Sequence, residues 1–250
     1  MLRYQDLVSI MPNDQPIFGL TAPPLDGVKS TLTVEQLAEL YVGEIRRVQP
    51  VGPYQIAGYS FGGIVAYEMA RQLALAGEIV AMVAILDTAN RHYYRQQSFA
   101  RRMQMRATRI MDLTGRYRRK LASKRLDQVV VDASMAVGRH LKPVGWRMAR
   151  TVFRLADRPM PEGMQDNLAL FAEIAEKYKP GPYKGRVLIV YAEERGREYR
   201  SNATLGWEDV AGDGVEVRYV PGDHMSFMHK PNVEQVAKHL VQFQHESAAR

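Results

Sequence analysis

The sequence predicts an α/β fold in which helices cover both faces of a mostly parallel sheet. Residues 79–86 and 186–191 are continuous apolar runs, as expected of parallel strands that are buried on both faces. Segments with the apolar spacing of a helix alternate with such runs along the chain. The 250 residues contain no internal repeat and no low-complexity linker, so we expect residues 1–250 to form one domain.

Local signals place the individual elements. A capping box formed by Thr33 and Gln36 opens one helix, which ends before Pro50, and Gly77 is the expected cap of the next helix. In chain order we expect a strand over 15–20, a helix over 34–49, a strand over 54–57, a helix that includes 64–70, strands over 79–86, 186–191 and 215–220, and a closing helix over 233–244.

A basic insertion of about a hundred residues separates the strands over 79–86 and 186–191. It is rich in Arg, Met and Ala, and we expect a helical lid at about 91–165 over the carboxyl edge of the sheet, where such folds bind ligands. Residues 91–158 hold 18 Lys and Arg against 4 Asp and Glu, whereas the remaining residues carry a net charge of −7. The positive charge of the chain therefore belongs to the insertion.

Composition excludes several classes of protein and site. The chain has no cysteine, which rules out disulfides, thiol catalysis and thiolate metal sites. The six histidines show no metal-ligand spacing, and we expect neither a metal nor a cofactor. No apolar run approaches the ~18 residues that span a membrane, and residues 1–6 contain no signal-peptide core, so the expected location is cytoplasmic.

The pentapeptide Gly58-Tyr59-Ser60-Phe61-Gly62 is the most informative motif in the chain. It is a G-x-S-x-G run between a predicted strand and a predicted helix, which is the context of a nucleophile elbow. In such an elbow a sharp turn exposes the serine, and the helix N-terminus behind it favours developing negative charge. Ser60 is therefore the expected nucleophile.

A serine hydroxyl is a poor nucleophile until a base removes its proton, so Ser60 needs a histidine. His224 is the strongest candidate, because it directly follows the strand over 215–220 in a loop that reaches the carboxyl edge of the sheet. His229 lies farther into the same loop and is the second choice.

The histidine in turn needs a carboxylate to orient it. Asp87 directly follows a buried strand, where an unpaired charge would be costly. Glu193 and Glu194 follow the next strand, and Asp223 adjoins the histidine, so these three acids are its competitors. The order of serine, then Asp87 or Glu193, then histidine along the chain is that of α/β-hydrolases.

Residues 4–95 and 165–245 resemble the type I thioesterase domains of non-ribosomal peptide and polyketide synthases. The matching stretches are 14–20, 48–54, 58–63, 66–70, 84–88, 178–180, 206–207 and 221–224. The resemblance implies an α/β-hydrolase fold with a helical lid, Ser60 as nucleophile, His224 as base, and Asp87 in preference to Glu193 as the orienting acid. It also implies that the backbone N–H of Phe61 is one donor of the oxyanion hole.

The resemblance further implies a substrate: an acyl or peptidyl chain in thioester linkage to the phosphopantetheine arm of a carrier protein. Water would release a free acid, and an internal hydroxyl or amine would give a ring; the sequence leaves both open. Two alternative functions also stay open, a non-catalytic module that binds the carrier protein and a general lipase or carboxylesterase with the same triad.

Three interpretations of the basic insertion remain. It is the solvated surface of a lid, a docking face for a carrier protein, or a surface that binds nucleic acid or a membrane. Carrier proteins of such synthases are commonly acidic, so charge complementarity places docking on Arg116, Arg118, Arg119 and Lys120. The same cluster would support the third interpretation, but no nucleic-acid motif accompanies it, and we expect no nucleic-acid partner and no membrane span.

The chain departs from the family pattern at its N-terminus. Family members begin with an apolar strand and a Gly-rich loop, which precede the helix expected to begin over 3–10. The loop donates the other N–H of the oxyanion hole. Residues 1–14 contain neither, so we expect a truncated N-terminus and no central strand between 15–20 and 54–57. One oxyanion donor is typically worth about 10²–10³ in rate, so we expect low stability or weak activity unless another amide fills the gap.

Overall fold

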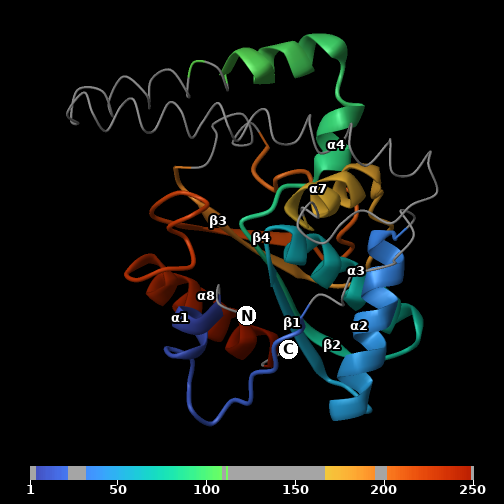
Figure 1. Cartoon of the computed structure of the whole chain (residues 1–250), viewed down its shortest axis with the longest axis vertical. Helices are drawn as coiled ribbons and strands as arrows, with labels where there is room; N and C mark the ends of the chain where they lie inside the picture. Colours follow the sequence, from blue (N-terminus) through green and yellow to red (C-terminus); the bar gives the residue numbers. More distant parts are fainter. Residues whose placement is uncertain (1–3, 22–31, 109–110, 112–166, 195–201, 249–250) are drawn as a thin grey trace.

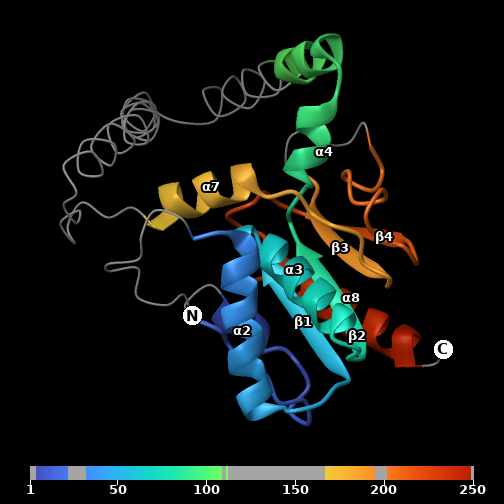
Figure 2. The same ribbon diagram turned by 90° about the vertical axis from the view of Figure 1, so that its right-hand side faces the viewer.

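A computed structural model of the chain describes residues 4–21, 32–108, 111, 167–194 and 202–248 (Figures 1 and 2). The described residues contain a four-stranded sheet in which all neighbouring strands are parallel. Its strands, in both chain and spatial order, are β1 (Tyr54–Tyr59), β2 (Val80–Leu86), β3 (Val187–Ala192) and β4 (Val215–Val220). The α/β class predicted from the sequence is confirmed, as are the four strands after residue 50.

The helices also agree with the sequence prediction. The capping box is formed, because Thr33 accepts the backbone N–H of Gln36 and the Gln36 side chain accepts the N–H of Thr33. Gly77 ends the helix after β1 with φ of +82°, a conformation that glycine adopts without strain. The helices are α1 (Gln5–Val8), α2 (Val34–Val48), α3 (Phe61–Leu75), α4 (Arg91–Gln96), α7 (Asn167–Lys177) and α8 (Asn232–Ala248), and residues 99–108 are also helical.

Two apolar clusters lie on opposite faces of the sheet. Alternation along β2 sends Val83 and Ile85 into one cluster and Ala84 and Leu86 into the other, and all four side chains are fully buried. The first cluster is covered by α2, α3 and α7, and the second by α1 and α8 (Figure 1). This three-layer arrangement fixes the carboxyl ends of the strands, from which the site is built.

The strand predicted over 15–20 is wrong. Residues 16–21 have no regular secondary structure, and the side chain of Phe18 is 68% exposed. A strand exists only where a neighbour lies about 4.8 Å away to share its hydrogen bonds, and β1 pairs only with β2 among the described strands. On its other edge, the backbone N–H of Tyr59 donates to the hydroxyl of Tyr4 at 3.0 Å.

Candidate active site

The three residues predicted to form the catalytic site all follow strands of the sheet. Ser60 comes directly after β1, Asp87 directly after β2, and His224 a few residues after β4. Parallel strands end at the same edge of a sheet, so residues far apart in sequence meet there.

Ser60 occupies a strained turn between β1 and α3. Its φ of 56° and ψ of −122° lie outside the regions that ordinary residues prefer. Hydrogen bonds hold this turn: the N–H of Ser60 donates to the carbonyl of Leu86 at 2.9 Å, and its carbonyl accepts the hydroxyl of Thr88 at 2.6 Å. The same carbonyl accepts the N–H of Gly63 at 3.0 Å. The turn is thus attached to the residues on either side of Asp87.

Gly58 explains why the turn needs a glycine before the serine. A Cβ atom at this position would lie 2.0 Å from the carbonyl oxygen of Gly62, which is backbone and cannot move aside. Only glycine permits this close approach of β1 to the first turn of α3. The motif therefore forms the tight strand–turn–helix connection that the sequence predicts.

Asp87 is completely buried and both its carboxylate oxygens have partners. Oδ2 lies 2.5 Å from Nδ1 of His224, and Oδ1 accepts the backbone N–H of Ala192 at 3.1 Å. The N–H of Asp87 donates to the carbonyl of Val190 at 2.7 Å, which fixes the backbone as well. A carboxylate held from both sides cannot rotate away from the histidine.

Tyr59 holds the other side of His224 and was missed by the sequence analysis. Its ring stacks on the imidazole with centroids 4.8 Å apart and planes 24° apart, and its hydroxyl donates to the backbone carbonyl of His224. The ring of Phe227 also stacks on Tyr59, with centroids 5.9 Å apart and planes 9° apart. The only signal in the sequence was the position of Tyr59 next to Ser60, which does not reveal that its ring turns toward the β4–α8 loop.

The competing acids and the second histidine lie on the surface or in the turn that carries His224. Glu193 and Glu194 are exposed, at the end of β3. The carboxylate of Asp223 accepts the N–H groups of Met225 and Ser226 and so shapes the turn that carries His224. His229 lies 3.1 Å from the carboxylate of Asp6, and both side chains are largely exposed.

Phe61 is the first residue of α3 and directly follows Ser60. The first N–H groups of a helix have no acceptor within the helix, and they point toward its N-terminal end, beside Ser60. The phenyl ring of Phe61 stacks on Phe171 of α7, with centroids 4.7 Å apart and planes 13° apart. One residue thus brings both a backbone donor and an apolar ring to the edge of the site.

A buried charged network fastens α3 to the segment after α7, and the sequence analysis did not identify it. The carboxylate of Glu68 accepts two hydrogen bonds from the guanidinium of Arg71, at 2.7 and 2.8 Å, and one from the side-chain amide of Gln72. The hydroxyl of Tyr178 donates to the same carboxylate at 2.7 Å. A single acidic residue in an apolar helix gives no sequence signal of such partners.

The two protonation states in this network follow from its hydrogen bonds. Burial alone would raise the pKa of Glu68, but the hydrogen bonds from Arg71, Gln72 and Tyr178 favour its charged form and lower the pKa below the ordinary value. Burial and the neighbouring Glu68 carboxylate raise the pKa of Tyr178, so its phenol stays protonated and remains a donor.

Where the insertion leaves and rejoins the sheet, α4 and α7 are held together. Arg91 lies 2.8 Å from the carboxylate of Glu176, and Arg95 donates to both the carboxylate and the backbone carbonyl of Glu176. Of the lid expected at 91–165, only residues 91–108 and 111 are among those described. The predicted docking residues Arg116, Arg118, Arg119 and Lys120 lie outside the described residues.

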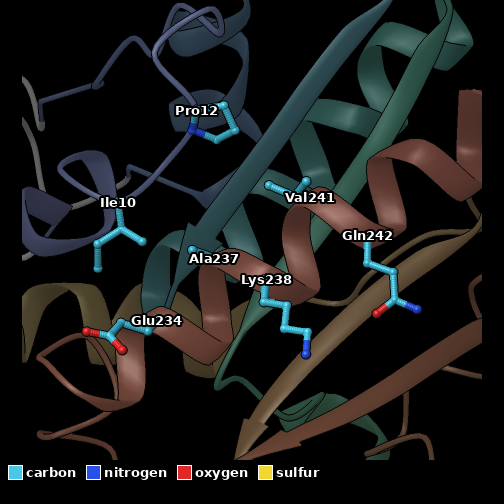
Figure 3. A pocket seen from close by; sticks show the side chains of 7 residues that line it. All are labelled: Ile10, Pro12, Glu234, Ala237, Lys238, Val241 and Gln242. Carbon is cyan, nitrogen blue, oxygen red and sulfur yellow. The ribbon is translucent and has the colours of Figure 1, made fainter.

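A surface groove lies away from the predicted catalytic residues. It has a volume of about 500 Å³, between the segment after α1 and one side of α8 (Figure 3). It is lined by Ile10, Pro12, Glu234, Ala237, Lys238, Val241 and Gln242.

Within the parts of the chain that the structure describes, every helix is too short or too polar to cross a membrane.

Comparison with known proteins decides the family. Residues 2–243 match the family described as Thioesterase domain. The chain belongs to this family. The thioesterase domain is 29% identical over 231 residues to malpibaldin synthetase of Mortierella alpina, which covers 91% of this chain. It is 26% identical over 254 residues to orsellinic acid synthase of Emericella nidulans, which covers 93% of it.

These relatives are much longer than the thioesterase domain. The chain spans 4% of malpibaldin synthetase and 11% of orsellinic acid synthase. A further relative, covering 91% of the chain at 23% identity, is named inactive atromentin synthetase invA6 of Paxillus involutus. Membership of the family therefore does not by itself establish turnover.

Solved structures show the fold. The Vlm2 thioesterase domain bound with a dodecadepsipeptide gives a TM-score of 0.58 at 18% identity, covering 96% of this chain and 90% of that one. A four-domain nonribosomal peptide synthetase bound to AMP and glycine gives 0.62 at 23% identity, over 97% of this chain and 18% of that one. The α/β-hydrolase fold expected from the sequence is thereby confirmed for this thioesterase domain.

Proposed function

We propose that this domain is a serine thioesterase that releases an acyl, peptidyl or polyketide chain from the phosphopantetheine arm of a carrier protein. The hydrogen bond between Asp87 Oδ2 and His224 Nδ1 carries the proposal, because it lies at the sheet edge where the elbow presents Ser60. Family membership and the relatives among peptide and polyketide synthases support the substrate class.

The first step forms an acyl-enzyme. With Nδ1–H bonded to Asp87, Nε2 of the neutral imidazole accepts the proton of Ser60 Oγ as Oγ attacks the thioester carbonyl. The N–H of Phe61 donates to the developing oxyanion. Collapse of the tetrahedral intermediate breaks the carbon–sulfur bond, and His224 returns the proton to the departing pantetheine sulfur.

The second step releases the chain. His224 removes a proton from water, whose oxygen attacks the acyl-Ser60 carbonyl. The bond between the acyl carbon and Oγ then breaks, His224 gives the proton to Ser60 Oγ, and the chain leaves as a free acid. A hydroxyl or amine of the bound chain in the same position would yield a lactone or lactam instead. Hydrolysis and cyclisation thus use the same residues and differ only in which nucleophile reaches the ester.

The proposed nucleophile is tested by covalent labelling. Incubation with a fluorophosphonate followed by peptide mass spectrometry is expected to place the adduct on Ser60 alone, because only a serine activated by a base reacts readily. Ser60→Ala should abolish labelling, whereas Ser9→Ala, at an exposed serine after α1, should not. A folded but unlabelled protein would contradict the proposal and favour a non-catalytic carrier-binding role. Faster turnover of oxyesters than of matched thioesters would favour a lipase or carboxylesterase.

We also propose that the carrier protein docks on the basic insertion, in the cluster Arg116, Arg118, Arg119 and Lys120. The net positive charge of the insertion supports this, since an acidic partner would be steered toward it. Reversing the charge at Arg118 and Arg119 is expected to raise KM about tenfold for a carrier-bound thioester and to spare a small soluble thioester.

The matched control for docking reverses two exposed lysines outside the insertion, Lys184 and Lys230. This control has the same change in net charge and should leave both KM values within about twofold. If the two charge-reversal variants raised KM for the carrier-bound substrate equally, only overall charge would matter and the docking site would be elsewhere.

A further inference from the structure

The stacked rings of Phe61 and Phe171 lie where the proposed chemistry would place the substrate. Phe61 immediately follows the predicted nucleophile, and Phe171 belongs to α7, which lies near the N-terminal end of α3 (Figures 1 and 2). Both side chains are partly exposed, so the pair forms a surface and is not sealed in the core. Leu170 and Met105 are also partly buried against the same apolar cluster.

We propose that the pair Phe61–Phe171 is the wall of the acyl-binding site and that it selects substrates with an apolar or aromatic group close to the thioester carbonyl. This inference rests on the proposed function, because it uses the oxyanion role of the Phe61 amide. It adds the chemical class of the chain and assigns a specificity-determining role to Phe171.

Bond lengths set how close the substrate must come to this wall. An oxyanion that accepts the N–H of Phe61 lies about 3 Å from that nitrogen, so the reacting carbon is only one bond farther. The phenyl ring belongs to the same residue, and only two carbon atoms, Cα and Cβ, separate it from that nitrogen. A substituent of the reacting carbon therefore passes close to the stacked rings.

The reacting carbon carries two substituents, the acyl chain and the pantetheine arm. Polarity decides which of them lies against the rings. The pantetheine arm contains amides, and burying them against a phenyl face without hydrogen-bond partners would cost free energy. An apolar acyl chain gains by leaving water, and an aromatic group gains further by packing on an aromatic face. The acyl chain is therefore the substituent placed on the pair, and the pantetheine arm leaves in another direction.

Phe171 is a suitable position for a test because α7 does not depend on this stack alone. The far end of α7 is held by the contacts of Arg91 and Arg95 with Glu176. The segment after it is held by the hydrogen bond between Tyr178 and Glu68. Truncating Phe171 should therefore change the wall and leave the helix in place.

The experiment compares Phe171→Ala with Phe99→Ala, which removes a phenyl ring that is 70% exposed at the start of the insertion. For each variant, kcat/KM is measured with octanoyl and acetyl thioesters of N-acetylcysteamine. The ratio of octanoyl to acetyl kcat/KM is expected to fall about tenfold or more in Phe171→Ala. Phe99→Ala should keep both the ratio and the rates of the unaltered protein.

Two results would overturn the inference. An unchanged ratio in Phe171→Ala with both rates reduced equally would mean that Phe171 only supports the fold, and an equal change in Phe99→Ala would mean that the effect is not local. Failure of the proposed function would look different from failure of this inference alone. The unaltered protein would then hydrolyse neither thioester and would not be labelled at Ser60, and that outcome would overturn both the proposed function and the inference.

Discussion

Asp87→Asn is expected to lower kcat for a small thioester by about 10³–10⁴-fold while the protein stays folded. The substituted amide has nearly the shape of the carboxylate, and its oxygen can still accept the N–H of Ala192. Its NH₂ group would face Nδ1 of His224, which then can only accept, so the proton moves to Nε2. A protonated Nε2 cannot take the proton of Ser60, and the first step loses its base.

The measurement is steady-state kinetics together with the rate of fluorophosphonate labelling, with circular dichroism to verify the fold. Glu193→Gln is the matched control, because Glu193 is the exposed acid at the end of the next strand that the sequence left as an alternative. It should keep kcat within about twofold. The assignment of Asp87 would be overturned if Glu193→Gln caused the larger loss or if Asp87→Asn kept most of the activity.

Glu68→Ala is expected to lower the free energy of unfolding by about 3–5 kcal/mol, the largest effect we expect on stability. The substitution leaves the buried hydroxyl of Tyr178 without its acceptor and removes the carboxylate that accepts both guanidinium hydrogen bonds of Arg71. Glu68→Gln keeps the volume and an acceptor oxygen, so it should cost less, about 2 kcal/mol. Urea denaturation at pH 7 measures both.

Glu44→Ala is the control for Glu68. Glu44 and Arg47 form a pair with the same spacing on α2, at 3.0 Å, but both side chains are more than half exposed. Such a pair contributes less than about 1 kcal/mol in water. Equal losses in Glu44→Ala and Glu68→Ala would show that spacing alone matters and that burial of the network adds nothing.

The pH dependence provides a further check on Glu68. Its pKa is lowered in the folded protein, so its contribution to stability is complete above the unfolded pKa of about 4.3 and is lost as the pH falls below that value through the folded pKa. The difference in unfolding free energy between the unaltered protein and Glu68→Gln should therefore be constant near neutral pH and shrink below about pH 4. If this difference in unfolding free energy grew on acidification, Glu68 would not be a charged, hydrogen-bonded carboxylate in the folded protein.

Much of the fold could be predicted because its signals are local. The strand β4 was predicted with its observed bounds, and the capping box of α2 with both its residues, since short apolar runs and caps depend on neighbours in sequence. The segment 15–20 shows the limit of this reasoning. Its composition suits a strand, but a strand also needs a partner in space, and periodicity does not show whether one is present.

The sequence by itself determined the elbow around Ser60 and put Asp87 and His224 at the ends of strands, because a motif and a strand end are properties of consecutive residues. Residue positions alone left both Asp87 and Glu193 open, and the family resemblance favoured Asp87. The tertiary structure places Asp87 against the imidazole, because that contact depends on how neighbouring strands pair. The contacts of Tyr59, Glu68 and Phe171 likewise join residues more than a hundred positions apart in the chain. Such contacts form only when the layers pack, and residue type alone does not specify them.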